Sequence, residues 1–347
     1  MLTRSAYGAR VRQGPVAATG SRLSLMSTQG GTKAIVAALS ANLGIAATKF
    51  LAFFLSGASS MLAEAVHSVA DSANQVLLLI GQRRGAKKAD AEHPFGYGRA
   101  RYVYAFVVSI ILFSLGGLFA IYEGIEKLAH PHPLDAAWWW LPFVVLLIAI
   151  GLESFSLRTA IRESRPHKGK ESWLKFIRHA KSPELPVVLL EDVAALLGLV
   201  LAFIGVGLTA LTGDGMWDGI GTLAIGALLV VVAIVLGVEM ASLLIGEGAS
   251  AADEARIRAA IEGTEGVDRI IHLKTLHLGP EELMVGAKIA LGPRTSLADV
   301  ARTIDAAERA MRDAVPAARV IYLEPDVDRG PSEPAPPTDA IVIRSAD

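Results

Sequence analysis

The sequence contains no cysteine among its 347 residues, and it has few charged residues. Without a thiol, the chain can form no disulfide, no thiolate metal site and no catalytic cysteine. Charged residues are 19% of the chain and hydrophobic residues are 52%, with a mean hydropathy of +0.44. Such a composition excludes an ordinary soluble protein. The formal net charge of -1 provides no general attraction for nucleic acid, so we expect no nucleic-acid partner.

Six apolar segments dominate the first two thirds of the chain. Each is long enough to cross a bilayer as a helix, for which about 20 apolar residues are needed. We therefore predict an α-helical polytopic membrane domain with six transmembrane helices over residues 33–247. The segments cover residues 34–56, 60–82, 102–126, 138–161, 185–211 and 217–245. Because three tryptophans begin the fourth segment, we expect them at a membrane interface.

The loops between these segments alternate in charge. The loops at 56–60, 129–137 and 211–216 contain no lysine or arginine. The loops after the second and fourth segments are basic, and the positive-inside rule places them in the cytoplasm with both termini. Their basic residues are Arg83, Arg84, Lys87, Lys88, Arg99, Arg101 and Arg162, Arg165, Lys168, Lys170, Lys175, Arg178, Lys181.

The two ends of the chain are predicted to be disordered tails, over residues 1–32 and 326–347. We expect a multi-pass protein of the bacterial plasma membrane. The first 33 residues contain arginine and serine but no acidic residue, so a mitochondrial membrane is the alternative. Met26 is an alternative start, because it leads directly into the first apolar segment.

A small cytoplasmic domain is predicted over residues 248–325. Helical apolar spacing at 250–263 and 296–316 alternates with strand-like patterns at 267–279, 282–292 and 318–325. The order α-β-β-α-β predicts a small α+β domain, with the helices on one face of a small sheet.

The second apolar segment carries ionisable residues in "MLAEAVHSVADSANQ", residues 61–75. An ionisable side chain at the centre of a span costs about 2.5–3.5 kcal/mol on insertion scales, so Glu64, His67 and Asp71 need an explanation. His67 and Asp71 are four residues apart and share one helical face. An imidazole and a carboxylate placed in this way can hold a divalent cation. The alternative is a buried His–Asp hydrogen bond.

The fifth segment carries Glu191 and Asp192 within an equally apolar run. Two adjacent carboxylates repel each other unless a cation or a proton is near, although they can instead be a polar pair in helix packing. Neighbouring residues point about 100° apart on a helix, so we expect one of the two to face His67 and Asp71. One nitrogen and several oxygens suit Zn²⁺, with Mn²⁺, Co²⁺ or Fe²⁺ as alternatives. No HExxH or GxSxG motif is found in a span, so we expect no enzyme.

The sequence resembles the cation diffusion facilitator family of divalent-metal/proton antiporters. The resemblance runs from Lys33 to Pro325. It rests on "SSMLAEAVHSVADS" at 59–72, "DAEHPFGYGRAR" at 90–101, the six spans and the α-β-β-α-β tail. The form "LLEDVAALLG" at 189–198 is similar to the branch that includes a mitochondrial zinc transporter. The resemblance implies a six-helix domain with a ferredoxin-like or metallochaperone-like cytoplasmic tail. It also implies a homodimer that exports Zn²⁺ from the cytoplasm in exchange for protons. The alternative is a membrane-embedded metal-binding regulatory or interaction protein without transport.

The resemblance also implies where the metal binds. The transport site of the family falls on His67, Asp71 and Asp192 in this sequence. The same three residues would couple metal transport to proton transport. A further ligand position of zinc members falls on Val188, so Glu191 is the expected replacement. In the loop after span two, Asp90 and His93 match a second metal site, in which Tyr97 replaces a histidine.

The tail departs from the family in its metal ligands. The ligand positions fall on Ile271, Ala287, Tyr322 and Glu324, of which only the last is acidic. We therefore expect no binuclear site in the tail. His272 and His277 are interpreted as ordinary strand residues.

The tail should therefore be a dimerisation module that folds without metal. Apolar side chains cannot coordinate Zn²⁺, but the strand alternation and the amphipathic helices persist. We expect a 249–325 fragment to fold in the presence of chelator and to self-associate, as measured by circular dichroism and sedimentation. Stoichiometric zinc binding that is lost on changing His272 or His277 would contradict this expectation.

Overall fold

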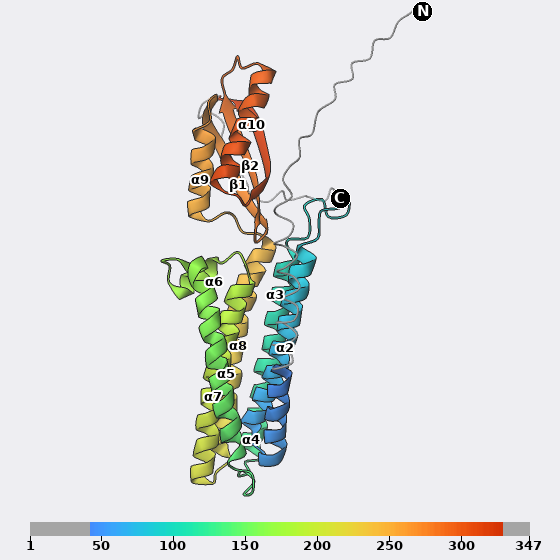
Figure 1. Cartoon of the computed structure of the whole chain (residues 1–347), viewed down its shortest axis with the longest axis vertical. Helices are drawn as coiled ribbons and strands as arrows, with labels where there is room; N and C mark the ends of the chain where they lie inside the picture. The colour runs from blue at the N-terminus through green and yellow to red at the C-terminus, as the bar shows by residue number, and fades with distance from the viewer. Residues whose placement is uncertain (1–41, 329–347) are drawn as a thin grey trace, which may run out of the picture.

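The computed structural model describes residues 42–328, so the predicted N-terminal tail, 1–32, lies outside the described residues. Figure 1 shows a long bundle of helices with a small domain of helices and strands beyond one end of it. The predicted fold class is confirmed: a helical membrane domain is joined to a small α+β domain.

The helices of the membrane domain follow the predicted apolar segments closely. A first helix is described over Asn42–Ser56. The others are α2 (Ser59–Gly85), α3 (Ala100–Ile111) continued by the π-helix η1 (Leu112–Leu118) and α4 (Phe119–Ala129), α5 (Leu141–Lys168), α7 (Glu184–Thr212) and α8 (Met216–Ile245).

Four of the described helical stretches are long and apolar enough to cross a membrane by themselves: Ala100–Ala129, Leu141–Pro166, Glu184–Thr212 and Met216–Ile245. The second helix, α2, has 27 residues. At 1.5 Å per residue it is about 40 Å long, which exceeds the roughly 30 Å hydrocarbon core. It is less apolar than those four helices because it carries polar side chains, among them Glu64, His67 and Asp71.

Two details of the membrane domain differ from the sequence prediction. The tryptophans at 138–140 lie in turns before α5 and do not begin the helix. The helix starts at Leu141, with Pro142 in its first turn, where a missing N–H has no cost. An additional short helix, α6 (Trp173–His179), lies within the second basic loop. The Ser172 hydroxyl caps it by accepting from the Lys175 amide at 3.2 Å.

Helix α8 lies against α7 on one side and against the α3–η1–α4 stretch on the other. The π-helix η1 packs closely against α8 at Gly117. A Cβ added at Gly117 would lie 2.6 Å from the Val230 side chain and 3.1 Å from its backbone nitrogen. A residue without a side chain is therefore required at Gly117, as is common where membrane helices pack tightly.

The tail domain has the predicted order of elements: α9 (Ala251–Glu262), β1 (Val267–Gly279), β2 (Glu282–Leu291), α10 (Leu297–Ala314) and β3 (Ala318–Val327). Strand β2 is central, antiparallel to β1 and parallel to β3. One hydrophobic core joins Ile257 of α9 and Met311 of α10 to alternate residues of β2, among them Val285 and Ile289. Both helices therefore cover the same face of the sheet.

The C-terminal boundary of this domain extends past the predicted one. Strand β3 continues to Val327, and Asp328 accepts two hydrogen bonds from the Arg269 guanidinium, both at 2.7 Å. The prediction of disorder from residue 326 is therefore wrong for 326–328. Residues 329–347 lie outside the described part of the chain.

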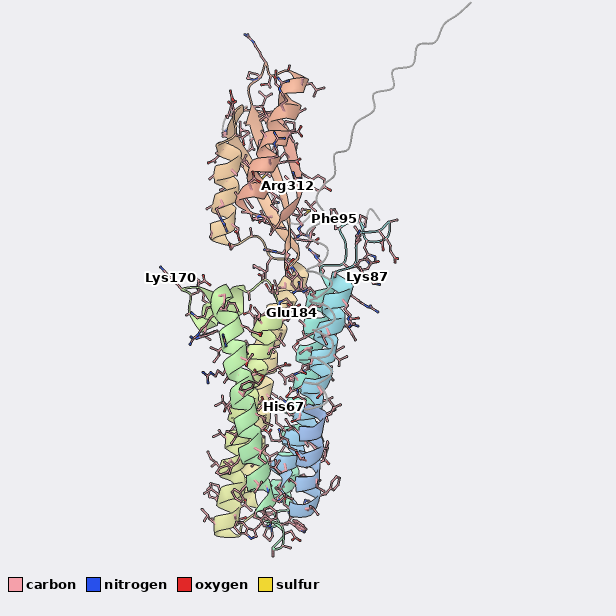
Figure 2. All side chains as sticks on the ribbon, in the orientation of Figure 1. His67, Lys87, Phe95, Lys170, Glu184 and Arg312 are labelled. Atoms are coloured by element: carbon pink, nitrogen blue, oxygen red, sulfur yellow. The ribbon has the colours of Figure 1, made fainter. Side chains whose placement is uncertain are left out.

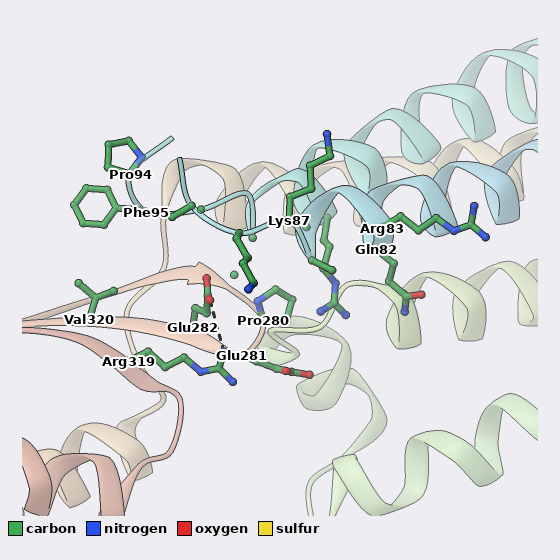
Figure 3. Close-up of a pocket in the computed structure, with 18 residues that line it drawn as sticks. Gln82, Arg83, Lys87, Pro94, Phe95, Pro280, Glu281, Glu282, Arg319 and Val320 are labelled. Carbon is green, nitrogen blue, oxygen red and sulfur yellow. Dashed lines mark ion pairs between the residues drawn. The ribbon is translucent and has the colours of Figure 1, made fainter. Parts of the chain in front are cut away.

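The two domains meet where the loop after α2 approaches the β1–β2 turn. A Cβ added at Gly98 would lie 2.7 Å from the Leu278 carbonyl oxygen, because two stretches of backbone are in contact there. A cavity of about 740 Å³ opens beside this contact, between Lys87 and Phe95 of the loop and Pro280 and Glu281 of the turn (Figure 3).

Glu247 forms a second connection between the domains. Its backbone carbonyl accepts from the His277 amide at 2.8 Å, and its carboxylate is ion-paired with Lys181 and accepts from Ser242. Burial opposes ionisation of Glu247, but these donors prevail and lower its pKa. Both basic loops lie at the tail end of the bundle, as Lys87 and Lys170 show in Figure 2.

Candidate metal centre

His67 lies near the middle of the helical bundle (Figure 2) and is 1% exposed. Its Nε2 is 3.5 Å from Asp71 Oδ2, which is longer than a good hydrogen bond of about 2.7–3.2 Å. Neither ring nitrogen of His67, nor Oδ1 of Asp71, has a hydrogen-bond partner among the described residues. Buried polar atoms are normally paired. The predicted alternative of a satisfied His–Asp pair therefore does not hold, and these atoms are available to a ligand.

A cavity of about 160 Å³ lies beside Asp71, between α2, α5 and α7. The wall from α7 contains both Glu191 and Asp192, so the expectation that only one of them faces Asp71 is wrong. Val188, one turn earlier, contributes an apolar part of the same wall. We name this space the carboxylate cavity.

Two hydrogen bonds orient the carboxylates of α7. Asn74 Nδ2 donates to Glu191 Oε1 at 2.7 Å from α2, and Ser156 Oγ donates to Asp192 Oδ2 at 3.0 Å from α5. Partners of this kind hold a ligand side chain in one rotamer and tune its basicity. The three helices are thereby connected around the carboxylate cavity.

The carboxylates of Asp71, Glu191 and Asp192 line the carboxylate cavity, and His67 lies beside Asp71. These side chains do not surround a single point. Within residues 42–328, no three His, Asp or Glu side chains lie close enough together to hold one ion. The predicted residues His67 and Asp71 of α2 and Glu191 and Asp192 of α7 thus come from two neighbouring helices, and gathering them around one ion requires movement of side chains or helices.

Two ionisable residues here were missed from the sequence. Glu153 of α5 lines the carboxylate cavity. Lys49 is buried in the first described helix, where its Nζ lies 2.9 Å from Glu64 Oε2 and 2.8 Å from Ser68 Oγ. In the sequence each is an isolated charged residue within an apolar run, and this isolation could have identified both residues as candidates. Glu64 is accordingly ion-paired with Lys49.

The predicted loop site at Asp90 and His93 has a different character. Asp90 Oδ1 accepts from the amides of Glu92 at 3.1 Å and His93 at 2.8 Å, and its Oδ2 accepts from the Tyr97 hydroxyl at 2.7 Å. The imidazole stacks on the Tyr97 ring with centroids 4.2 Å apart. The Tyr97 hydroxyl and the His93 amide lower the pKa of Asp90. The carboxylate thus organises the loop, and metal binding there stays a prediction.

The tail positions carry no ligand cluster. Ala287 lies in the domain core, Tyr322 is exposed and Glu324 is paired with Lys288 at 3.1 Å. His272 and His277 both lie in β1. His277 is buried, which lowers its pKa.

Comparison with known families adds to this geometry. Residues 35–245 match the family described as the cation efflux transmembrane domain, and residues 249–326 match the cytoplasmic domain of cation efflux proteins. The chain belongs to the cation efflux family. These cation efflux proteins, also called cation diffusion facilitators, are transporters and not enzymes.

Named cation efflux relatives come from animals, plants and bacteria. The chain is 32% identical over 244 residues to the mouse proton-coupled zinc antiporter SLC30A9, mitochondrial, and covers 42% of that protein. It is 30% identical over 268 residues to metal tolerance protein C4 of Arabidopsis thaliana, covering 58% of it. It is 25% identical over 302 residues to the cation-efflux pump FieF of Pectobacterium atrosepticum, covering 94% of it. In these alignments the matched part is 70%, 76% and 86% of the chain.

The arrangement of the loop leads to a prediction about Asp90. Replacing Tyr97 with Phe removes a donor that stabilises the ionised carboxylate, so the pKa of Asp90 should rise toward its ordinary value. A lowered pKa means that the contribution of Asp90 to loop order is present at neutral pH and is lost as the pH falls through that pKa. In Tyr97→Phe this loss should occur at higher pH, as measured by carbon NMR of labelled aspartate. The exposed Tyr122→Phe is the control, and equal titration in both variants would contradict the assignment.

Proposed function

We propose that this cation efflux protein exports Zn²⁺ from the cytoplasm in exchange for protons. The observation that carries the proposal is the buried His67 imidazole beside Asp71 at mid-depth in the bundle, which has no hydrogen-bond partner among residues 42–328 and lies next to a cavity lined by carboxylates. Ionisable groups in a span are expensive and mark ion pathways. A site at this depth can serve both sides of the membrane in turn.

The donor set supports zinc as the cargo. An imidazole nitrogen together with carboxylate oxygens suits Zn²⁺, which prefers four ligands of this kind. The mouse relative is named a proton-coupled zinc antiporter, whereas the plant relative is named only a metal tolerance protein. Mn²⁺, Co²⁺ and Fe²⁺ share the same ligand types, so a panel of metals is needed to rank them.

Proton exchange follows from the chemistry of the same groups. A metal ion binds a neutral imidazole and ionised carboxylates, so binding expels protons from the site. Protons that enter from the opposite side would displace the ion there. His67, Asp71 and Asp192 would therefore bind the metal and the protons alternately.

Placement and assembly belong to the same proposal. The basic loops lie at the tail end of the bundle, which supports a cytoplasmic tail in a bacterial plasma membrane. The match of the tail to the cytoplasmic cation efflux domain supports a homodimer. A regulatory protein that binds metal without moving it is the alternative. Flux measurements separate it from a transporter.

Substitution of the ligands should abolish transport while the fold persists. In Asp71→Asn and Asp192→Asn an amide replaces a charged ligand of the same shape, so zinc flux should fall at least about tenfold. The measurement is zinc uptake into proteoliposomes at equal protein content. Glu126→Gln, at an exposed position of α4, is the matched control. Near-normal flux in either aspartate variant would rule out the assigned site.

A pH gradient should drive the same flux. Acidifying the side that receives the zinc protonates the ligands there and releases the ion, so transport should become faster. Reversing the gradient should slow it. The test is wild-type zinc flux in proteoliposomes under the two gradients and at equal pH. Flux that does not respond to the gradient would indicate a uniporter.

A further inference from the structure

We propose that Glu153 of α5 is the fourth ligand of the zinc transport site, in the role that sequence comparison assigned to Glu191. The inference rests on the proposed function and names a ligand for the same site. It starts from the carboxylate cavity, whose wall contains Glu153 together with Asp71 and Asp192.

The orientation of α5 is set by a neighbour of Glu153. Ser156, three residues later, lies on the same face of the helix. Its hydroxyl donates to Asp192 Oδ2 at 3.0 Å, so this face of α5 is turned toward the carboxylates of α7. Glu153 is therefore held beside Asp192 by the packing of two helices, and not by a flexible loop.

The hydrogen bonds distinguish Glu153 from Glu191. Glu191 is 7% exposed, and its Oε1 already accepts from Asn74 at 2.7 Å. Glu153 is only partly buried and accepts no hydrogen bond from any residue between 42 and 328. Val188, on the same wall, has no atom that can coordinate a metal. Apart from Asp71, Glu153 is thus the carboxylate on this wall that accepts no hydrogen bond from a described residue.

The nearest buried cation does not neutralise this charge. Lys49 is paired with Glu64 at 2.9 Å and bonded to Ser68 at 2.8 Å. Carboxylates gathered without a partner repel one another, and a divalent cation removes that repulsion. An acidic cluster alone would not define a site. The independent indication is His67, 1% exposed, whose two ring nitrogens have no described partner and whose Nε2 is directed at Asp71.

The resulting ligand set is chemically complete. His67, Asp71 and Asp192 supply one nitrogen and two carboxylates, and Glu153 supplies the third carboxylate. Four nitrogen and oxygen ligands match the preferred coordination number of Zn²⁺. Glu191 then acts as a positioning residue that is hydrogen-bonded to α2 through Asn74.

The test is zinc binding by the full-length protein in lipid nanodiscs, measured by competition with a fluorescent zinc indicator. Glu153→Gln keeps the size of the side chain but removes its charge, and should weaken zinc binding at least about tenfold. Glu191→Gln should weaken binding less than Glu153→Gln does. Glu163→Gln, at an exposed position on the same helix, should bind as wild type does.

A second variant tests the role more directly. Val188→Asp places a carboxylate on the part of the cavity wall that α7 contributes, so in the Glu153→Gln background it should restore most of the lost affinity. Wild-type affinity in Glu153→Gln, or a larger loss in Glu191→Gln, would overturn the inference. If wild-type protein itself neither binds nor transports zinc, the proposed function fails. If it does both and Glu153→Gln is unchanged, only the ligand assignment fails.

Discussion

Every charge inside the helical bundle has to be compensated, and this requirement organises the membrane domain. Breaking a buried ion pair by removing one partner costs about 3–5 kcal/mol. Lys49 and Glu64 are paired at 2.9 Å, joining the first described helix to α2. Near the opposite end of the bundle from the tail, Lys127 lies 3.8 Å from Asp218, and donates to the Gly57 carbonyl at 2.9 Å. These pairs hold together helices whose apolar surfaces alone would allow many arrangements.

Asp218 anchors the start of the helix that carries His67 and Asp71. Its carboxylate accepts from the amide of Ser59 at 2.7 Å and from the amide of Ser60 at 3.3 Å, at the start of α2. These amides are among those that a helix leaves unsatisfied at its N-terminus, where negative charge is also favoured by the helix dipole. Helix α2 is thereby anchored to α8 at its first turn. His67 and Asp71 follow two and three turns later, at a depth and rotation that this anchor helps to determine.

The same principle separates structural charges from functional ones. Lys49 and Asp218 have partners at hydrogen-bonding distance, and Glu64 is paired with Lys49 through Oε2, although its Oε1 has no partner among the described residues. His67 and one oxygen of Asp71 do not have them among the described residues, although both are enclosed. A transporter has to leave at least one donor atom of each cargo ligand without a protein partner, because the ion would otherwise have to compete with that partner. The Asp90 carboxylate illustrates the contrast, since it is occupied by the loop that it shapes.

Hydropathy and periodicity predicted the fold well because they are local properties. Within residues 42–328 the apolar segments became helices, most of them with ends within a few residues of those expected, and the alternation at 267–279 and 282–292 became β1 and β2. The errors occurred where local patterns conflict with context. The tryptophans at 138–140 are apolar but precede Leu141, where α5 starts with Pro142 in its first turn. Asp326 and Asp328 appear polar and unstructured, yet they are drawn into ion pairs with Lys288 and Arg269.

The sequence by itself determined the class of protein, the apolar segments that form its described helices, and the placement of an imidazole and a carboxylate together on α2, because i,i+4 spacing fixes a helical face. The tertiary structure alone decided which carboxylates share a cavity with that face. Glu191 and Asp192 both reach it, and Glu153 joins them from a segment with no motif. The rotation and crossing of α5 and α7 against α2 place these groups, and they depend on side-chain packing and paired charges between helices distant in sequence. No local pattern along one helix contains that information.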